Sequence, residues 1–496
     1  MKTVQADYVP SSLPAYRGNR YIEALPDYLS YTTRAIAEAL QIEPEPIHPQ
    51  ASRRQRSAWL SSLNHEFFVP LARHIQLQET IDLMIREGYA KRCPRGNEPW
   101  SYYMDTYKRL QEGEKIKSLS FDGDSKADPM SATLIGCSGI GKSYGLSQIL
   151  NLYPQVIEHQ GNVNQIRTSQ IVYLLVQCPH EGSVKSLCAN IIAEISKATG
   201  ENYTDEIVTK RLTLQVLKVR LAHLMALHQV GLLVIDEIQN LATNKKSRTE
   251  LFNFIVDLAN SLSVPILYVG TPKLYGFMQK DLRIARRFAS FGVLDWDRLY
   301  KGTPEWNTFI SALSKVTLLK DTSSGLSQEL IDALYDCSQG IVDILIKLFI
   351  LTQLNCMALA QESLSPEAIY AVFEKHFKNV KPMIEALRNG DSQALDNYED
   401  IRLPESEFKK AKQEIAGELE DNLEAGNELQ SQELSGLRKI SNIYITMNQP
   451  VPQDVKDRIA VLEGVNADFE REAKVAESNK EKKKVDTRTT SEKLPE

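Results

Sequence analysis

The chain has 496 residues, of which 42% are hydrophobic and 25% are charged, and its formal net charge is −6. This composition is typical of globular domains, and it excludes a collagen-like chain, a wholly disordered chain and a small disulfide-stapled scaffold. At roughly 100–200 residues per domain, the length predicts two to four domains. The acidic balance excludes a protein that is basic throughout, although a local basic patch would be enough to bind nucleic acid.

The apolar runs and the spacing of cysteines and histidines further restrict the class of protein. Residues 1–7 contain no apolar run, which predicts no signal peptide. The longest apolar stretch, at 341–360, is interrupted by Asp343 and Lys347, so we interpret it as a buried helix rather than a membrane span. The six cysteines form no C-x-x-C pair, which indicates reduced thiols in a cytoplasmic protein. The eight histidines lack the spacing of metal ligands, and no structural metal is expected.

The first two of four predicted parts cover residues 1–300. Residues 1–62 form an N-terminal extension with a proline-rich hinge and a basic cluster, and we expect it to bind a partner. Residues 63–300 alternate short apolar runs with helical patterns, which predicts an α/β domain with a parallel five-stranded sheet. Its expected strands are Ser131–Gly136, Gln170–Gln177, Gly231–Asp236, Val264–Val269 and Phe291–Trp296. Residues 155–168, with the turn signal Gly161-Asn162, are expected to be a hairpin inserted between the first two strands.

The remaining two parts differ sharply in composition. Residues 301–384 show no strand signal and predict a small helical domain, with helices at Leu326–Cys337, Ile341–Gln361 and Pro366–Phe377. Residues 385–496 are rich in charge and are expected to form a helical or disordered tail. Two interpretations of this tail stay open, a solubilising segment and a peptide that folds on a partner.

The strongest motif in the chain is a phosphate-binding loop. It follows an apolar strand and precedes a helical pattern, which is the context that G-x-x-x-x-G-K-[ST] requires. Backbone N–H groups of such a loop point at phosphate oxygens, and the helix N-terminus adds a partial positive charge. Lys142 would neutralise the β- and γ-phosphates of ATP, and the Ser143 hydroxyl would bind Mg²⁺. The predicted nucleotide-binding residues are Gly136, Ser138, Gly139, Ile140, Gly141, Lys142, Ser143 and Tyr144.

A second motif places two acidic residues at the end of a buried strand. Residues 232–235 are apolar and lead directly into Asp236 and Glu237. Ligands bind at the carboxyl ends of parallel strands in α/β sheets. We therefore predict that Asp236 helps to hold Mg²⁺ and that Glu237 is the general base that activates water.

Two further groups could complete a hydrolytic site. Thr271 follows the apolar run 265–269, where its hydroxyl could touch the γ-phosphate and the attacking water. A plain exit from the strand into a turn is the alternative. Arg286 and Arg287 precede the last expected strand and could reach the nucleotide of a neighbouring subunit as arginine fingers. The alternative is a solvated basic turn.

These elements, in this order and followed by a helical domain, resemble those of AAA+ ATPases. Four local segments resemble more narrowly the TniB/TnsC group of bacterial transposition regulators, of the Tn-seven class, over roughly residues 66–380. The segments that carry the resemblance are Val172–Cys188, Asp236–Leu241 (DEIQNL), Tyr268–Phe277 and Ala285–Phe288.

The resemblance implies a function and a set of partners. ATP-bound subunits of such regulators form rings or helical filaments on double-stranded target DNA, and ATP hydrolysis disassembles the oligomer. They connect a TniQ-type target selector to the transposase, which in this chain would bind the C-terminal tail. The family often carries a sensor-2 arginine in the helical domain. This chain has none after Gly340, and Lys347 is the candidate replacement.

In a ring of such subunits, two loops should face the DNA in the central channel. Both are rich in lysine, arginine, small hydroxyls and amides, which suit phosphate contacts without base readout. The candidate DNA-binding residues are Lys185 and Ser186 in one loop, and Thr243, Lys245, Lys246 and Arg248 in the other. Solvated loops are the alternative.

Two other functions compete with transposition. One is a signalling NTPase of the STAND type that acts on protein partners alone. The other is a DNA-loading AAA+ protein, such as a clamp-loader-like ATPase. The basic loop that contains Lys245, Lys246 and Arg248 favours DNA binding over the first. A metabolic P-loop kinase is disfavoured, because the paired acids and paired arginines indicate an oligomeric ATPase.

Overall fold

The computed structural model describes two compact units. They are Met1–Leu354 with Glu362–Phe408, and Asn355–Gln361 with Lys409–Glu496. The described residues are 3–48, 51–92, 130–160, 168–180, 183–205, 213–243, 254, 264–278, 288–319, 325–359, 361, 363–390, 407–415, 435, 437, 438, 452, 455, 456 and 458–460. Among these residues, no helix is both long and apolar enough to cross a bilayer. Residues 407–415 are helical, and most of the predicted tail lies outside the described part.

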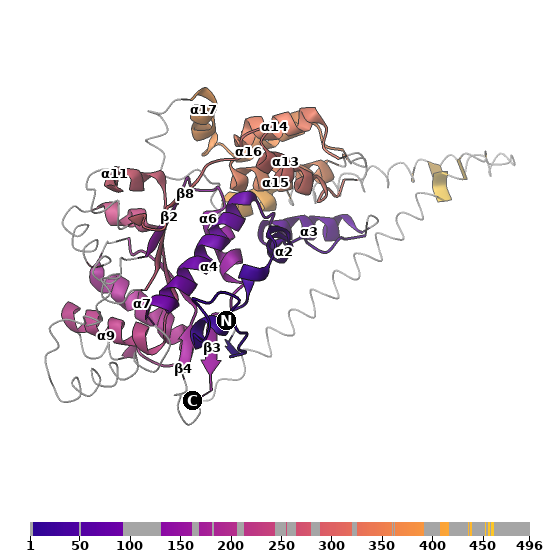
Figure 1. The fold of residues 1–496 in the computed structure, drawn as a ribbon. Helices are drawn as coiled ribbons and strands as arrows, with labels where there is room; N and C mark the ends of the chain where they lie inside the picture. The colour runs from indigo at the N-terminus through magenta and orange to yellow at the C-terminus, as the bar shows by residue number, and fades with distance from the viewer. Residues whose placement is uncertain are drawn as a thin grey trace, which may run out of the picture. The chain divides into compact units, whose positions relative to one another are not determined.

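The centre of the first unit is a parallel five-stranded sheet, as predicted (Figure 1). The strands are β2 (Ser131–Gly136), β5 (Tyr173–Gln177), β6 (Leu232–Asp236), β7 (Ile266–Gly270) and β8 (Val293–Trp296), in the spatial order β5-β6-β7-β2-β8. Every residue of β2, β6 and β7 is buried. Such continuous apolar runs are typical of parallel strands whose two faces are both covered. The order brings the ends of β6, β7 and β2 next to one another.

Helices pack against this sheet, and α7 and α9 begin at polar side chains that cap their first turns. The helices are α4 (Ala72–Arg92), α6 (Lys142–Leu150), α7 (Val184–Thr199) and α9 (Leu214–Leu227), and short turns η2 (Ile238–Thr243), η3 (Pro272–Leu274) and α11 (Tyr275–Met278) follow β6 and β7. The Ser183 hydroxyl accepts from Ser186 N at the start of α7, and Gly200 ends the helix in the left-handed conformation. Helices α7 and α9 pack on each other, and α7 packs on β5.

The N-terminal residues pack on the domain that contains the five-stranded sheet. They contain β1 (Thr3–Gln5), α1 (Arg20–Glu23), η1 (Tyr28–Ser30), α2 (Thr33–Leu40) and α3 (Arg53–Glu66). Strand β1 is the edge of a separate three-stranded sheet with β3 (Val156–His159) and β4 (Thr168–Ile171). Tyr28 Oη donates to the carbonyl of Leu152 at 2.7 Å, and Tyr16 Oη donates to Glu87 at 2.6 Å. Buried Asn19 donates to the carbonyl of Tyr89 at 3.2 Å. The residues predicted as an extension therefore belong to the same compact unit as the sheet.

The predicted strand Gln170–Gln177 is wrong, because this run is two strands in different sheets. Strand β4 pairs with β3, β5 pairs with β6, and Val172 alone separates them. The two strands separate at the point where Gly231 lies against the backbone of Val172. A Cβ added to Gly231 would be 2.4 Å from the carbonyl oxygen of Val172. A hairpin is present, since β3 and β4 pair antiparallel, but its second strand lies at 168–171, beyond the predicted bounds of 155–168. Its turn lies outside the described residues.

The helical lid after β8 contains more helices than predicted. Its helices are α13 (Pro304–Ser314), α14 (Gln328–Ser338), α15 (Val342–Ala358), α16 (Pro366–His376) and α17 (Lys381–Asn389). Helices α14, α15 and α16 match the three predicted ones, whereas α13 and α17 were not predicted. Helix α13 begins with a Thr303 cap, a proline at its first turn and Glu305.

Candidate nucleotide site

The phosphate loop connects buried strand β2 to helix α6. Gly141 caps α6 with a φ of 93°, which an L-residue rarely adopts. At Gly136, a Cβ would lie 2.4 Å from Ile140 Cδ1 and 2.5 Å from the Trp296 carbonyl oxygen. Glycine is therefore required at both ends of the loop, and the N-terminus of α6 faces the space that the loop encloses.

Lys142 is folded over this loop. Its Nζ donates to the carbonyl oxygens of Gly136 at 2.6 Å and Cys137 at 2.8 Å, and the residue is 9% exposed. A buried ammonium group needs such partners. It supplies a fixed positive charge above the loop, where phosphate oxygens can replace the carbonyls.

The two predicted magnesium-binding residues are in contact. Ser143 Oγ donates to Asp236 Oδ2 at 2.9 Å, across from the first turn of α6 to the end of β6. A hydroxyl and a carboxylate that leave room for waters and phosphate oxygens fit Mg²⁺, which retains several such ligands. Among the described residues, no cluster of three or more His, Cys, Asp or Glu side chains could hold a metal by itself.

Glu237 follows Asp236 in an unusual backbone conformation. Its φ is 56°, and its amide donates to Asp236 Oδ1 at 2.8 Å. A non-glycine residue with positive φ is uncommon and persists where surrounding contacts hold it. Gln239, which was not among the predicted site residues, donates from Nε2 to the Glu237 carboxylate.

Thr271 lies at the end of β7, beside the end of β6. The residue is 8% exposed, and its Oγ1 is a buried atom without a hydrogen-bond partner among the described residues. An unsatisfied buried hydroxyl is costly. This hydroxyl is therefore suited to bind a phosphate oxygen or a water that the loop brings to it.

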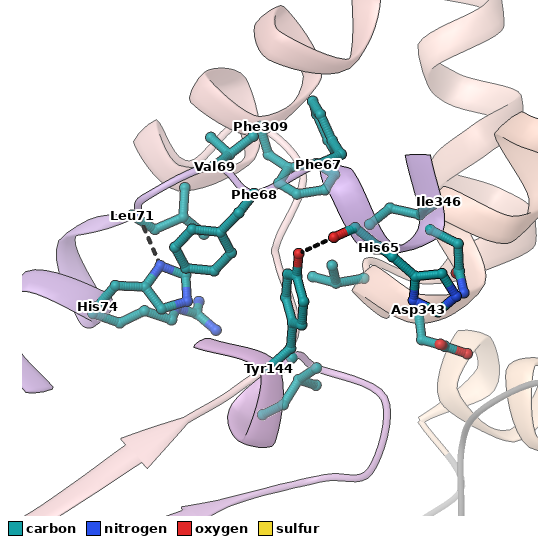
Figure 2. Close-up of a pocket in the computed structure, with 15 residues that line it drawn as sticks. His65, Phe67, Phe68, Val69, Leu71, His74, Tyr144, Phe309, Asp343 and Ile346 are labelled. Atoms are coloured by element: carbon teal, nitrogen blue, oxygen red, sulfur yellow. Dashed lines mark hydrogen bonds between the residues drawn. The ribbon is translucent and has the colours of Figure 1, made fainter. Parts of the chain in front are cut away.

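A cavity of about 220 Å³ adjoins the phosphate loop (Figure 2). Three distant segments line it: the end of α3 and the chain leading to α4, the start of α6, and the lid. The lining residues are Asn64, His65, Phe67, Phe68, Val69, Leu71, Arg73, His74, Ile140, Gly141, Tyr144, Phe309, Val342, Asp343 and Ile346. An apolar cleft with a few polar groups is the usual form of a small-molecule site.

Hydrogen bonds hold the cavity walls together. Tyr144 Oη donates to the carbonyl of His65 at 2.8 Å, as Figure 2 shows. The Leu71 amide donates to Nδ1 of His74 at 2.9 Å, so the ring is neutral with its proton on Nε2. In the lid, the Asp343 amide donates to the carbonyl of Gly139 in the phosphate loop at 2.9 Å. Of the residues that line the cavity, Ile140, Gly141 and Tyr144 were predicted as nucleotide-binding residues.

Lys347 lies in the lid behind Asp343. Its Nζ is 2.8 Å from Asp343 Oδ1, and its side chain is 2% exposed. Asp343 lines the cavity and Lys347 does not. A sensor role for Lys347 stays a prediction.

The other predicted residues are described only in part. Lys185 is exposed and Ser186 half-buried in the first turn of α7. Thr243 ends η2, and its side chain lies outside the described part of the chain. Residues 244–250 and 279–287 also lie outside it, and with them Lys245, Lys246, Arg248, Arg286 and Arg287.

The sheet order, phosphate loop and helical lid define a P-loop ATPase with the AAA+ fold. Residues 100–298 match the family model for TniB, described as bacterial TniB protein, which confirms the resemblance to the TniB/TnsC group. The matched residues include the phosphate loop, the acidic pair and Thr271.

More distant likenesses concern the fold alone. One solved structure is the Walker-type ATPase paby2304 of Pyrococcus abyssi, at 13% identity and a TM-score of 0.33, covering 66% of this chain and 91% of that chain. Another is Cdc6p from Pyrobaculum aerophilum, at 11% identity and a TM-score of 0.35, covering 66% of this chain and 88% of that one. A search of curated proteins returned no match.

Proposed function

We propose that the protein is an ATPase that assembles with ATP on double-stranded DNA and regulates transposition. In this proposal it links a TniQ-type target selector to the transposase, and hydrolysis disassembles the oligomer. The contact between Ser143 Oγ and Asp236 Oδ2 carries the ATPase part, because it joins the phosphate loop to the acidic strand end. The TniB match supports the role in transposition.

The cavity and the phosphate loop suit a nucleoside triphosphate. The base and ribose would lie among the aromatic and aliphatic side chains, next to Tyr144. The phosphates would lie over the N-terminus of α6 and receive hydrogen bonds from the loop amides and Lys142. Ser143 and Asp236 would hold Mg²⁺, which supplies charge neutralisation at the β- and γ-phosphates.

Hydrolysis would use three groups around the γ-phosphate. Glu237 would accept a proton from the attacking water, and the unpartnered hydroxyl of Thr271 would orient that water or a γ-phosphate oxygen. Arg286 or Arg287 of a neighbouring subunit would stabilise the charge that develops on the phosphate. An arginine supplied in this way makes turnover depend on assembly.

DNA and protein partners would bind away from the nucleotide. Lys185 and Ser186 at the start of α7 would contact DNA phosphates, together with the Thr243, Lys245, Lys246 and Arg248 loop. Such contacts do not read sequence, which suits a protein that coats many targets. The N-terminal residues and the charged tail would bind the target selector and the transposase, and the subunits would form a ring or filament.

A gel-shift experiment tests this proposal. Random duplex DNA is mixed with the wild-type protein and ATP, with ADP, or with the Lys142→Ala protein and ATP. We expect slowly migrating, salt-sensitive complexes only with wild type and ATP, and ATP turnover that Lys142→Ala loses. Equal complexes in all three mixtures would contradict nucleotide-gated assembly. ATP turnover without DNA binding, also in the presence of a TniQ-type protein, would favour an NTPase that acts on proteins alone.

A further inference from the structure

One side chain connects the predicted base to the sensor threonine. Gln239 lies in η2, two residues after Glu237. Its Nε2 donates to the Glu237 carboxylate, and its Oε1 accepts from the Thr271 amide at 3.2 Å. A carboxamide is planar and holds its donor and acceptor in fixed directions. The ends of β6 and β7 are therefore bridged by a single rigid group.

The surrounding backbone is shaped to accept this group. Gly270 ends β7, and a Cβ there would lie 2.8 Å from Gln239 Oε1 and 2.9 Å from Ile238 Cγ2. Any side chain at position 270 would therefore push the carboxamide out of place. On the other side, Glu237 holds its left-handed conformation through its own amide and through its carbonyl, which accepts from the Asn240 amide at 3.0 Å.

We propose that Gln239 is a positioning residue for ATP hydrolysis, which sets the Glu237 carboxylate and Thr271 in one geometry around the attacking water. This inference rests on the proposed ATPase function. Gln239 orients a reactive group rather than taking part in the chemistry. Misplacement of a catalytic group by about 1 Å can lower a rate by about 10²-fold. Its loss should therefore lower kcat and leave nucleotide affinity unchanged.

Two substitutions of Gln239 separate positioning from packing. Gln239→Leu keeps the bulk and removes both hydrogen bonds. Gln239→Glu keeps the shape and the acceptor for Thr271 N, and its carboxylate replaces the amide donor to Glu237 by a like charge.

The experiment measures kcat and KM for ATP on the full chain with saturating DNA. Affinity for a fluorescent ADP analogue and the melting temperature are measured in parallel. Gln328 provides the control, because its Nε2 donates to Asp332 at 2.6 Å on the exposed surface of lid helix α14. Gln328→Leu and Gln328→Glu remove an equivalent hydrogen bond between an amide and a carboxylate, at a position far along the chain from Glu237.

We expect Gln239→Leu to lower kcat by roughly 10–100-fold while ADP-analogue affinity stays within about twofold. Gln239→Glu should also lower kcat, because its carboxylate lies against that of Glu237 in place of the amide donor. A kcat within about twofold of wild type in both variants would overturn the inference. Loss of ADP-analogue affinity in parallel with kcat would also overturn it. If Gln239→Leu does not fold, the kcat and ADP-analogue affinity of the near-isosteric Gln239→Glu decide.

The wild type and Glu237→Gln separate this inference from the proposed function. If the wild type does not hydrolyse ATP, the proposed ATPase itself fails. If the wild type is active, Glu237→Gln is inactive and the Gln239 variants behave as wild type, only the role of Gln239 fails.

Discussion

The imidazole of His74 lies directly against Gly145, in the first turns of the helix that follows the phosphate loop. A Cβ on Gly145 would be 2.9 Å from Cδ2 and 3.0 Å from Nε2 of the ring. The ring is also packed edge-on against Trp296, with centroids 5.0 Å apart. The helix that carries Lys142 thus packs on a ring that lines the cavity beside the phosphate loop.

Gly145→Ala should damage the nucleotide site by overpacking. The added methyl group would displace the His74 ring, and overpacking of this kind costs about 1–3 kcal/mol. We expect a lower melting temperature and weaker binding of a fluorescent ATP analogue. Ser147→Ala, on the same helix, serves as the control. Wild-type affinity and melting temperature in Gly145→Ala would show that the ring moves aside freely.

His74 should make stability depend on pH. Burial, with Arg73 adding to it and Glu305 opposing it, lowers the pKa of His74 to about 3. The unfolded chain takes up a proton near pH 6.5 that the folded chain refuses. This contribution to stability is therefore full above pH 6.5, falls by about 1.4 kcal/mol per pH unit below it, and levels off near pH 3. In His74→Asn, denaturant unfolding at pH 6.5 and 5 should give a smaller pH difference, by about 2 kcal/mol. Equal differences would contradict a neutral His74.

Glu237→Gln should bind ATP and DNA but turn over slowly. The amide keeps the shape of the side chain and cannot accept the proton of the attacking water, so kcat should fall by about 10²–10⁴-fold. Complexes on DNA should persist after free ATP is removed. They are followed by gel shift over time, with the wild type dissociating as the control. Normal turnover in this variant would remove Glu237 from the role of base.

Lys185→Ala should reduce the salt dependence of DNA binding. Each phosphate contact makes the slope of log K against log salt more negative by about 0.9. Removing one contact should therefore make the slope less steep by about 0.9 for every DNA sequence alike. Lys197→Ala is the control, because this exposed lysine of the same helix pairs with Glu194 at 3.4 Å near the helix end. An unchanged slope in Lys185→Ala would place DNA elsewhere.

Deletion of residues 480–496 should leave ATPase activity within about twofold of wild type. The segment is dominated by lysine, glutamate and small polar residues and cannot bury enough apolar surface to support a core. Activity and melting temperature of the shortened and full chains are compared. A loss of both would show that the tail is structural.

Apolar runs were sufficient to predict the central sheet, because parallel strands buried on both faces leave an unmistakable pattern. They failed at Val172, because the apolar run 171–176 passes from the end of β4 into β5 without a turn residue. The close approach there of Gly231, a residue 59 positions away in the sequence (231 − 172), has no local signal. Helix α13 could have been predicted, since Thr303-Pro304-Glu305 carries the same start signal as Ser365-Pro366-Glu367.

Only one wall of the cavity beside the phosphate loop could be predicted from the sequence. Tyr144 follows the phosphate loop and is visible from the motif. Phe68 and Asp343 reach the cavity through tertiary contacts, and no local pattern indicates these. Gln239 is next to the acidic pair in the sequence, yet its second partner, Thr271, comes beside it only through the order of β6 and β7.

The single residue between β4 and β5 connects the small N-terminal sheet to the central sheet. Strand β1 is hydrogen-bonded to β3, β3 to β4, and Val172 alone separates β4 from β5. At the far end of β5, the carbonyl of Cys178 accepts from Asn240, the neighbour of Gln239, at 3.2 Å. A displacement of the N-terminal strand would therefore be passed through β3 and β4 to β5. It arrives at the acidic end of β6, where ATP hydrolysis would take place.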